Sequence, residues 1–181
     1  WPLFVAALQK RPAVLAPFVT RPNEKVLDRA ALGLEPAEVC VTGVYALRKA
    51  DPKRKRDGTV VLQESGVAYA FLEEALPLLD KQGLNLNVFY VASAELFDLL
   101  PEAEQKRIFP GELAAEAIGI TGFTLPTMFR WVTSDRGRAA TLHPFMRGHY
   151  LGSGSAAAVL KEAHMDGESQ CKAVVEYVKG R

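Results

Sequence analysis

The sequence predicts an α/β fold, in which a three-layer, mostly parallel (mixed) sheet carries helices on both faces. Two observations support this prediction. Short apolar runs alternate with longer stretches of helix-forming residues along the chain, and strands that alternate with helices form mostly parallel sheets. Several of these apolar runs are continuous, which is typical of strands that are buried on both faces.

The expected strands are short runs rich in β-branched and aromatic residues. The clearest is 88–91, Val-Phe-Tyr-Val, which follows Gly83 and a polar Asn85 and precedes small residues. A run of this length beside turn residues is typical of a buried parallel strand. Five further strands are expected, at residues 13–15, 39–41, 60–62, 114–120 and 138–142.

Helices are expected between several of these strands. Their ranges are 67–81, 101–107 and 156–163, the last continuing as 168–179. The charged stretch 101–107 is expected to be a solvated helix that ends before Pro110. Pro77 lies inside 67–81, and an interior proline costs about 3 kcal/mol or forces a kink. We therefore expect that helix to bend or restart at Pro77.

The residues that follow the strand at 88–91 have a recognisable order. They are Ser93, the corner Glu95-Leu96-Phe97-Asp98, a charged helix, Pro110, and the run Ala-Glu-Ala-Ile-Gly at 115–119. This order resembles the C-terminal domain of transketolase and of related thiamine-diphosphate-dependent enzymes. Similar segments flank it at the positions 43–48, 58–67, 129–132 and 152–156, so the resemblance covers about residues 43–178. Taken alone, Glu95 and Asp98 are expected to serve as a helix cap or in a salt bridge.

The resemblance also implies a division of the chain. Residues 43–181 would form the transketolase C-terminal-like domain, and residues 1–42 would be the edge of the preceding pyrimidine-binding domain plus a linker. The chain begins at Trp1 without an initiator Met, which we take as a sign that it is cut from something longer. The alternative is that residues 1–22 are the N-terminal arm of a single domain.

The resemblance implies a domain that is catalytically incomplete alone. It would be part of a transferase of carbohydrate metabolism and would serve packing, subunit contact or regulation. Thiamine diphosphate and Mg²⁺ would be held by the missing domains and not by this segment. The expected partners are the remaining domains or subunit of the same enzyme, which is expected to be a homodimer.

Three alternatives remain open. The chain could be a C-terminal domain of a 2-oxo-acid dehydrogenase E1-type enzyme, since residues 121–149 depart from the transketolase pattern. It could be a natural small subunit that completes a split enzyme. It could also be an independent module that binds an anionic ligand.

Few residues are candidates for a binding site. By resemblance, Arg21 is the nearest match to an arginine that contacts substrate phosphate, although it could equally be an exposed linker residue. The turn Gly152-Ser153-Gly154-Ser155 precedes a predicted helix, so its N–H groups could bind an anion, while Ser153 or Ser155 is expected to cap the helix.

The polar segment before this turn contains two histidines and an arginine. His143, Arg147 and His149 are expected to face a partner subunit. The two histidines have no third ligand nearby in the sequence, so we predict no metal site. Arg130 and Trp131 could also pack on another subunit, although a tryptophan is more often part of a core.

The composition excludes several classes of protein. With 49% apolar and 24% charged residues the chain is ordinary for a globular protein. A formal net charge of +1 argues against a partner that is nucleic acid or acidic membrane, and no apolar run approaches the ~20 residues of a membrane-spanning helix. Cys40 and Cys171 are too few for a disulfide framework. We expect a buried free thiol at Cys40 and a cytoplasmic location.

One local charge cluster stands out against this balance. Residues 51–58 contain four consecutive cations, Lys53-Arg54-Lys55-Arg56, between two aspartates. Such a run could contact phosphates, but it contains no aromatic residue on which bases could stack. Pro52 and Gly58 beside it are typical of a turn, so we expect a solvated loop.

Overall fold

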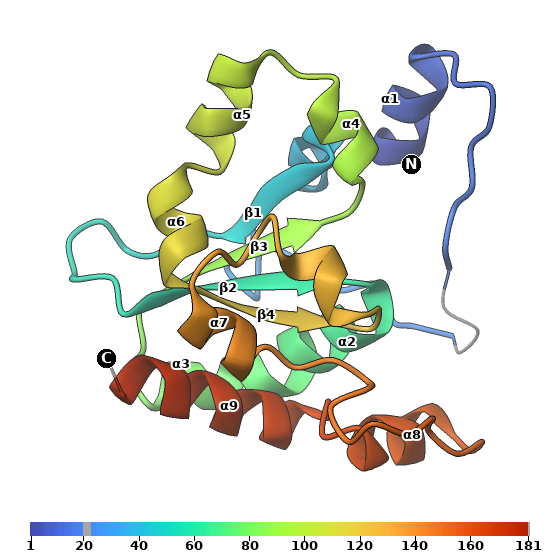
Figure 1. Cartoon of the computed structure of the whole chain (residues 1–181). Helices are drawn as coiled ribbons and strands as arrows, with labels where there is room; N and C mark the ends of the chain where they lie inside the picture. The colour runs from blue at the N-terminus through green and yellow to red at the C-terminus, as the bar shows by residue number, and fades with distance from the viewer. Residues whose placement is uncertain (20–22, 181) are drawn as a thin grey trace.

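A four-stranded mixed sheet organises the protein (Figure 1). The computed structural model describes residues 1–19 and 23–180. Strand β2 lies between β3 and β4 and is parallel to both, whereas β1 pairs antiparallel with β3 at one edge. The predicted mostly parallel sheet with helices on both faces is confirmed. The strands are β1 (Val44–Arg48), β2 (Gly58–Gln63), β3 (Leu86–Val91) and β4 (Ala117–Thr121).

Helices cover both faces of the sheet, and each face has its own hydrophobic core. On one face, Val60 and Leu62 pack in a cluster with residues of α2 (Ser65–Ala70), α3 (Leu76–Lys81) and α9 (Gly167–Lys179). On the other face, Val61 packs with Phe97 and Trp131. The elements on that side are α4 (Ala94–Asp98), α5 (Glu102–Ile108), α6 (Gly111–Glu116) and η3 (Leu125–Met128).

The predicted disruption at Pro77 takes the form of a π-helical segment. Between α2 and α3 lies η2 (Phe71–Ala75), where the N–H of Leu76 donates to the carbonyl of Phe71, five residues earlier. Proline has no N–H to donate to the carbonyl four residues before it. This turn contains one more residue than an α-helical hydrogen-bonded turn, and the helix then continues as α3.

Two predicted strands near the N-terminus are wrong. Residues 13–15 are exposed and lie outside the sheet, between prolines that favour an isolated extended chain. Residues 39–41 belong to the 3₁₀ helix η1 (Ala37–Thr42), which ends at Gly43 with φ 79°. Strand β1 begins only after that glycine. Helix α1 (Pro2–Gln9) precedes both segments.

Two further strand predictions need correction. Residues 114–116 are the last turn of α6, so β4 begins three residues later than expected. Residues 138–140 belong to helix α7 (Asp135–Ala140), whose N-terminus is capped by the Ser134 hydroxyl accepting from the N–H of Gly137 at 3.1 Å. Only Leu142 pairs with the sheet, through a parallel bridge to Ile120.

The remaining helices agree with the sequence. Helix α5 and the pair α8 (Ala156–Glu162) and α9 lie where they were predicted, and His164, with φ 55°, separates α8 from α9. Both cysteines are buried and free. No helix in the described ranges has the length and apolarity that crossing a membrane requires.

The corner at residues 95–98 has a structural role. The hydroxyl of Ser93 caps α4 by accepting from the N–H of Leu96 at 3.2 Å, and the carboxylate of Asp98 pairs with Arg130. The salt bridge expected of Asp98 is confirmed. Trp131 is 2% exposed and contacts Phe97 edge to face, so it belongs to the core and does not face a partner.

We predict that Gly43→Ala destabilises the protein far more than Gly83→Ala. Both glycines have φ values near 75°, at 79° and 73°, but a Cβ at Gly43 would lie 2.2 Å from the carbonyl oxygen of Ser93, whereas a Cβ at Gly83 would meet nothing within 4 Å. The left-handed backbone alone should cost about 1–2 kcal/mol at either position. The clash should raise the cost at Gly43 to about 3 kcal/mol or more. Urea unfolding measures both, and equal losses would contradict the close packing of Gly43 against α4.

Candidate functional site

The site residues predicted from sequence fall into two groups. Arg21 lies outside the described residues, so its role stays a prediction. His143 follows Leu142 at the end of the sheet, and Arg147, Gly152, Ser153 and Ser155 lie in the connection that leads to α8. Partial burial lowers the pKa of His143, which therefore favours the neutral imidazole.

The turn before α8 is occupied by the chain's own side chains. The N–H of Gly152 donates to both carboxylate oxygens of Glu162, at 3.1 and 3.2 Å. Ser155 caps α8 by accepting from the N–H of Ala158 at 3.3 Å, as expected for one of the two serines. Arg147 contacts the ring of His164 and not the turn. An external anion at Gly152 would have to displace Glu162, and this predicted role remains untested.

Open α/β folds usually bind ligands at the carboxyl ends of their parallel strands. In open α/β sheets, ligands bind where the connections of two neighbouring strands leave in opposite directions. Here β2 connects to β3 on one side, whereas β4 leads to Leu142 on its other side. Gln63, Glu64, Thr121 and Gly122 therefore lie at this switch point.

Internal contacts fill this carboxyl edge. Glu64, with φ 81°, caps α2 by accepting from the N–H groups of Gly66 at 2.6 Å and Val67 at 3.1 Å. Its carboxylate thus occupies the helix N-terminus that could otherwise attract an anion. The Oε1 atom of Gln63 accepts from the hydroxyls of Thr121 and Thr127. A positive φ in a non-glycine residue carries strain, so the backbone conformation of Glu64 lowers the stability of the folded chain.

The N-terminal segment passes beside this edge. Phe18 packs edge to face on Phe123, with ring centroids 5.9 Å apart, beside Gly122. Within residues 1–19 and 23–180, no group of three or more His, Cys, Asp or Glu side chains could hold a metal ion. The polar side chains of Glu64, Gln63 and Thr121 at the carboxyl edge thus already have hydrogen-bond partners within the chain.

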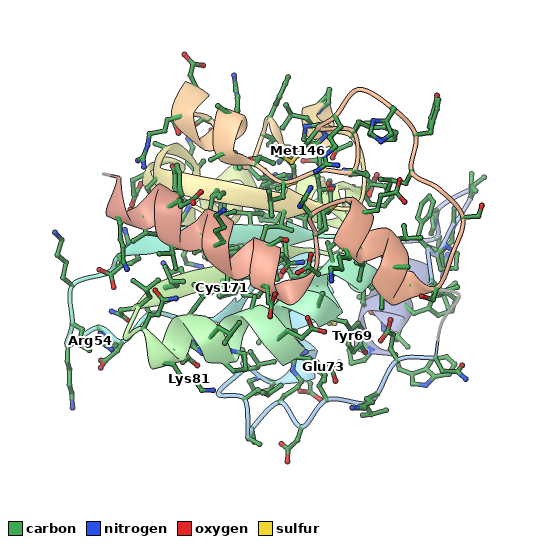
Figure 2. All side chains as sticks on the ribbon, turned by 90° about the horizontal axis from the view of Figure 1, so that it is seen from below. Arg54, Tyr69, Glu73, Lys81, Met146 and Cys171 are labelled. Atoms are coloured by element: carbon green, nitrogen blue, oxygen red, sulfur yellow. The ribbon has the colours of Figure 1, made fainter. Side chains whose placement is uncertain are left out.

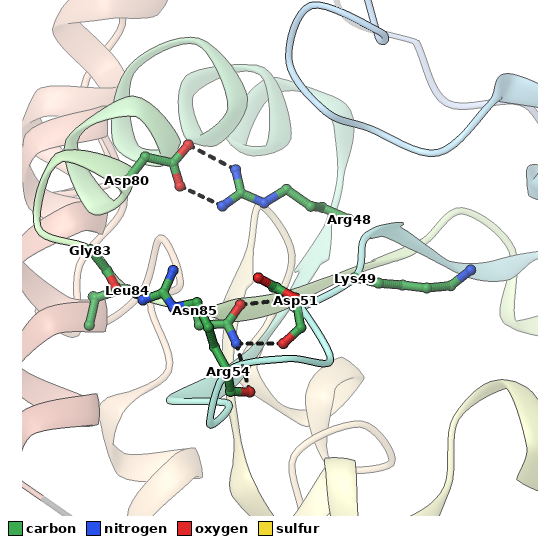
Figure 3. Close-up of a pocket in the computed structure, with 8 residues that line it drawn as sticks. All are labelled: Arg48, Lys49, Asp51, Arg54, Asp80, Gly83, Leu84 and Asn85. Carbon is green, nitrogen blue, oxygen red and sulfur yellow. Dashed lines mark hydrogen bonds and ion pairs between the residues drawn. The ribbon is translucent and has the colours of Figure 1, made fainter.

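The opposite, amino edge of the sheet contains an open polar cavity of about 390 Å³ (Figure 3). We call it the amino-edge cavity. It lies where β1 ends and β3 begins, beside the end of α3. Its lining carries three cations and two carboxylates, and the lining residues are Arg48, Lys49, Asp51, Arg54, Asp80, Gly83, Leu84 and Asn85.

One side chain organises the loop that walls this cavity. The Nδ2 group of Asn85 donates to the carbonyls of Asp51, Arg54 and Lys55, and its Oδ1 atom accepts from the N–H of Asp51 at 2.8 Å. The N–H of Asn85 donates to Asp57 at 2.8 Å. The loop predicted as a solvated turn is thus fixed to the sheet by a residue about 30 positions away.

Ion pairs and a hydrogen bond to a backbone carbonyl fix the three cations around the cavity. Arg48 forms a two-pronged pair with Asp80, and the Nη2 group of Arg54 donates to the carbonyl of Gly83 at 2.6 Å. The Nζ atom of Lys49 lies 3.0 Å from Glu35, and Figure 3 shows its side chain extending away from the two arginines. Sequence analysis missed this site, although the basic run at 53–56 was a signal for part of it.

A second hollow of about 530 Å³ lies between α3 and α9. Figure 2 labels Lys81 on the first of these helices and Cys171 on the second. Its apolar lining includes Leu78, Val175 and Cys171. Burial raises the pKa of the Cys171 thiol, and the side-chain amide of Gln82 contacts its sulfur at 3.7 Å. A buried thiol with a raised pKa is a poor nucleophile, so Cys171 does not supply this hollow with a reactive thiolate.

Comparison with known proteins gives a result at the level of the fold. No protein-family model and no curated protein matches the chain. Among solved structures, transketolase from Leishmania mexicana is similar with a TM-score of 0.57 and 18% identity over 78% of this chain. Transketolase from Campylobacter jejuni has a TM-score of 0.55 and 20% identity over 75%. A Pichia stipitis transketolase complex with sedoheptulose 7-phosphate has a TM-score of 0.57 and 19% identity over 82%.

These similarities cover only part of each known enzyme. The matched region is 18–20% of the transketolase chains, so this chain spans about a fifth of their length. Sequence identity at this level supports the fold and not a shared activity. The chain therefore has a transketolase C-terminal-domain-like fold.

We predict that Glu64→Gly is less destabilising than Glu64→Ala. Both changes remove the cap of α2, but alanine retains the strain of φ 81° and glycine does not. Glycine also caps better than alanine, so the expected gap in unfolding free energy is about 2 kcal/mol.

The matched control is Ser155, which caps α8 with an ordinary φ of −65°. Its glycine and alanine variants should differ by at most about 1 kcal/mol. Thermal or urea unfolding compares the two gaps. Equal gaps at positions 64 and 155 would show that the backbone at Glu64 is not strained.

Proposed function

We propose that this chain acts as the C-terminal domain of a thiamine-diphosphate-dependent enzyme of the transketolase type, and that it is catalytically incomplete alone. The observation that carries the proposal is the fold similarity, which covers 75–82% of this chain and only 18–20% of each transketolase. A unit that corresponds to a fifth of an enzyme would serve packing and subunit contact. Because the similar structures are transketolases, we prefer this type to a 2-oxo-acid dehydrogenase.

The N-terminal segment supplies a surface for such contact. Trp1, Val14 and Phe18 are 92%, 80% and 81% exposed, and several other apolar side chains of residues 1–19 are exposed as well. Large exposed apolar surfaces mark sites of association. In the proposed role, residues 1–42 are the edge of a preceding pyrimidine-binding domain plus a linker, and the rest of that domain would cover these side chains.

The cofactor would be bound elsewhere in the proposed enzyme. Thiamine diphosphate carries a diphosphate that binds together with Mg²⁺, which prefers carboxylate and other oxygen ligands. The two carboxylates of the amino-edge cavity already have partners, since Asp80 holds Arg48 and Asp51 accepts from the N–H of Lys53. We therefore assign the cofactor and Mg²⁺ to the other domains.

We predict that the purified chain shows neither ketol transfer nor Mg²⁺-dependent binding of thiamine diphosphate. The physical reason is that the groups expected to hold and activate the cofactor belong to other domains. A coupled assay of transfer and calorimetry with and without Mg²⁺ test this. Measured transfer or decarboxylation by the 181-residue chain would overturn the domain assignment.

We further predict that the chain associates with a transketolase truncated inside its pyrimidine-binding domain, at the point that corresponds to residue 1 of this chain. The double variant V14S/F18S should weaken this association at least tenfold, because it removes two apolar side chains from the exposed N-terminal segment. The matched control is Leu99→Ser, since Leu99 is 60% exposed and lies outside that segment. Analytical ultracentrifugation measures the complex, and equal weakening by both variants would exclude the N-terminal segment as the contact surface.

A further inference from the structure

The amino-edge cavity is built from four separate parts of the chain. The end of β1 contributes Arg48, the following loop contributes Arg54, the end of α3 contributes Asp80, and the residue before β3 is Asn85. Figure 3 shows Arg48 and Arg54 on different elements, with the guanidinium group of Arg48 directed at the carboxylate of Asp80. The fold thus brings together cations that are separate in the sequence.

The cavity is organised before any ligand binds. Asn85 fixes the loop through its side-chain amide, and the side-chain carbonyl of Asn87 also accepts from the N–H of Ala50 at 2.8 Å. Asn85 is only 5% exposed, so water competes little for these hydrogen bonds. A ligand would therefore not have to order the loop, which lowers the cost of binding.

The two arginines are held by groups that leave donors for a ligand. Arg48 is bound by Asp80, and the described hydrogen bond of Arg54 is to the carbonyl of Gly83. A guanidinium carries more N–H donors than these bonds use. Each arginine is thus fixed in position and keeps N–H donors that these bonds do not use.

We propose that the amino-edge cavity binds the phosphate group of a small, polar phosphorylated molecule. Guanidinium groups recognise phosphate through paired, charge-assisted hydrogen bonds. A tetrahedral phosphate presents oxygens to donors from two directions, whereas a planar carboxylate suits a single guanidinium fork. The position of Arg48 and Arg54 on two elements favours phosphate.

The rest of the lining limits what the phosphate is attached to. Leu84 is the only apolar residue among the eight that line the cavity, and none of the eight is aromatic. A nucleobase would have no ring on which to stack. The volume of about 390 Å³ is within the range of small-molecule sites, so a short hydroxylated phosphate ester fits this chemistry.

The carboxylates of the cavity oppose anion binding and make the affinity sensitive to salt. Asp80 competes with the ligand for Arg48, and Asp51 adds a second negative charge. The cavity is open to solvent, and exposed charges are screened by salt. Binding should therefore weaken strongly as the ionic strength rises. This proposal is independent of the transketolase-type role.

The test is titration of the whole chain with glycerol phosphate and inorganic phosphate, followed by NMR of the backbone amides. Saturable shifts are expected around Arg48, Arg54 and Asn85. Arg54→Gln should weaken binding about tenfold, because it removes one charge-assisted donor. Arg54 has an exposed side chain, and circular dichroism would show that the variant is folded.

The matched control is Lys53→Gln, which removes the same charge from the same loop at a residue outside the lining. It should weaken binding less than about twofold if contact and not overall charge decides the affinity. Equal weakening by the two variants, or no saturable shift with the wild-type chain, would overturn the proposal. Tighter binding of succinate than of glycerol phosphate would also overturn it, since it would identify a carboxylate site.

Discussion

The complete burial of β2 is the constraint on which the rest of the structure depends. Val60 and Leu62 point to one face of the sheet and Val61 to the other, and all three are fully buried. A parallel strand in the middle of a sheet therefore needs helices on both sides. α2, α3 and α9 cover one face and α4 to α6 the other. With both faces covered, the strand ends are the parts of the sheet left open to polar ligands.

The same burial explains which strands could be predicted from sequence. The continuous apolar runs at 60–62 and 88–91 are strands because both of their faces meet a core. The runs at 39–41 and 138–142 are also short, and local hydrogen bonds place them mostly in helical turns. Helix caps and left-handed glycines decide such cases. The periodicity of a short apolar run does not show whether it forms a strand or a helical turn.

The candidate sites were less accessible to prediction because they depend on contacts between distant residues. The basic run at 53–56 was correctly expected to form a loop, but its shape is set by Asn85, far along the sequence. Arg48 enters the cavity from β1, which was not predicted as a strand. Nor did the sequence indicate that Glu64 would turn back to cap α2 with a positive φ. Local patterns predict elements, whereas these sites arise from how the elements meet.

The two edges of the sheet differ in how their polar groups are satisfied. At the carboxyl edge, the acceptor at the start of α2 is Glu64 itself, and Phe18 packs nearby on Phe123. At the amino edge, carboxylate and carbonyl partners hold the arginines from one side, and an open volume remains on the other. The carboxylate of Glu64 occupies the place that an anionic ligand would take at the N-terminus of α2. The two arginines, in contrast, are held in position by their partners and are preorganised for a ligand. At the usual ligand edge of this fold the N-terminus of α2 is therefore already occupied by Glu64, and the proposed anion site lies at the opposite edge.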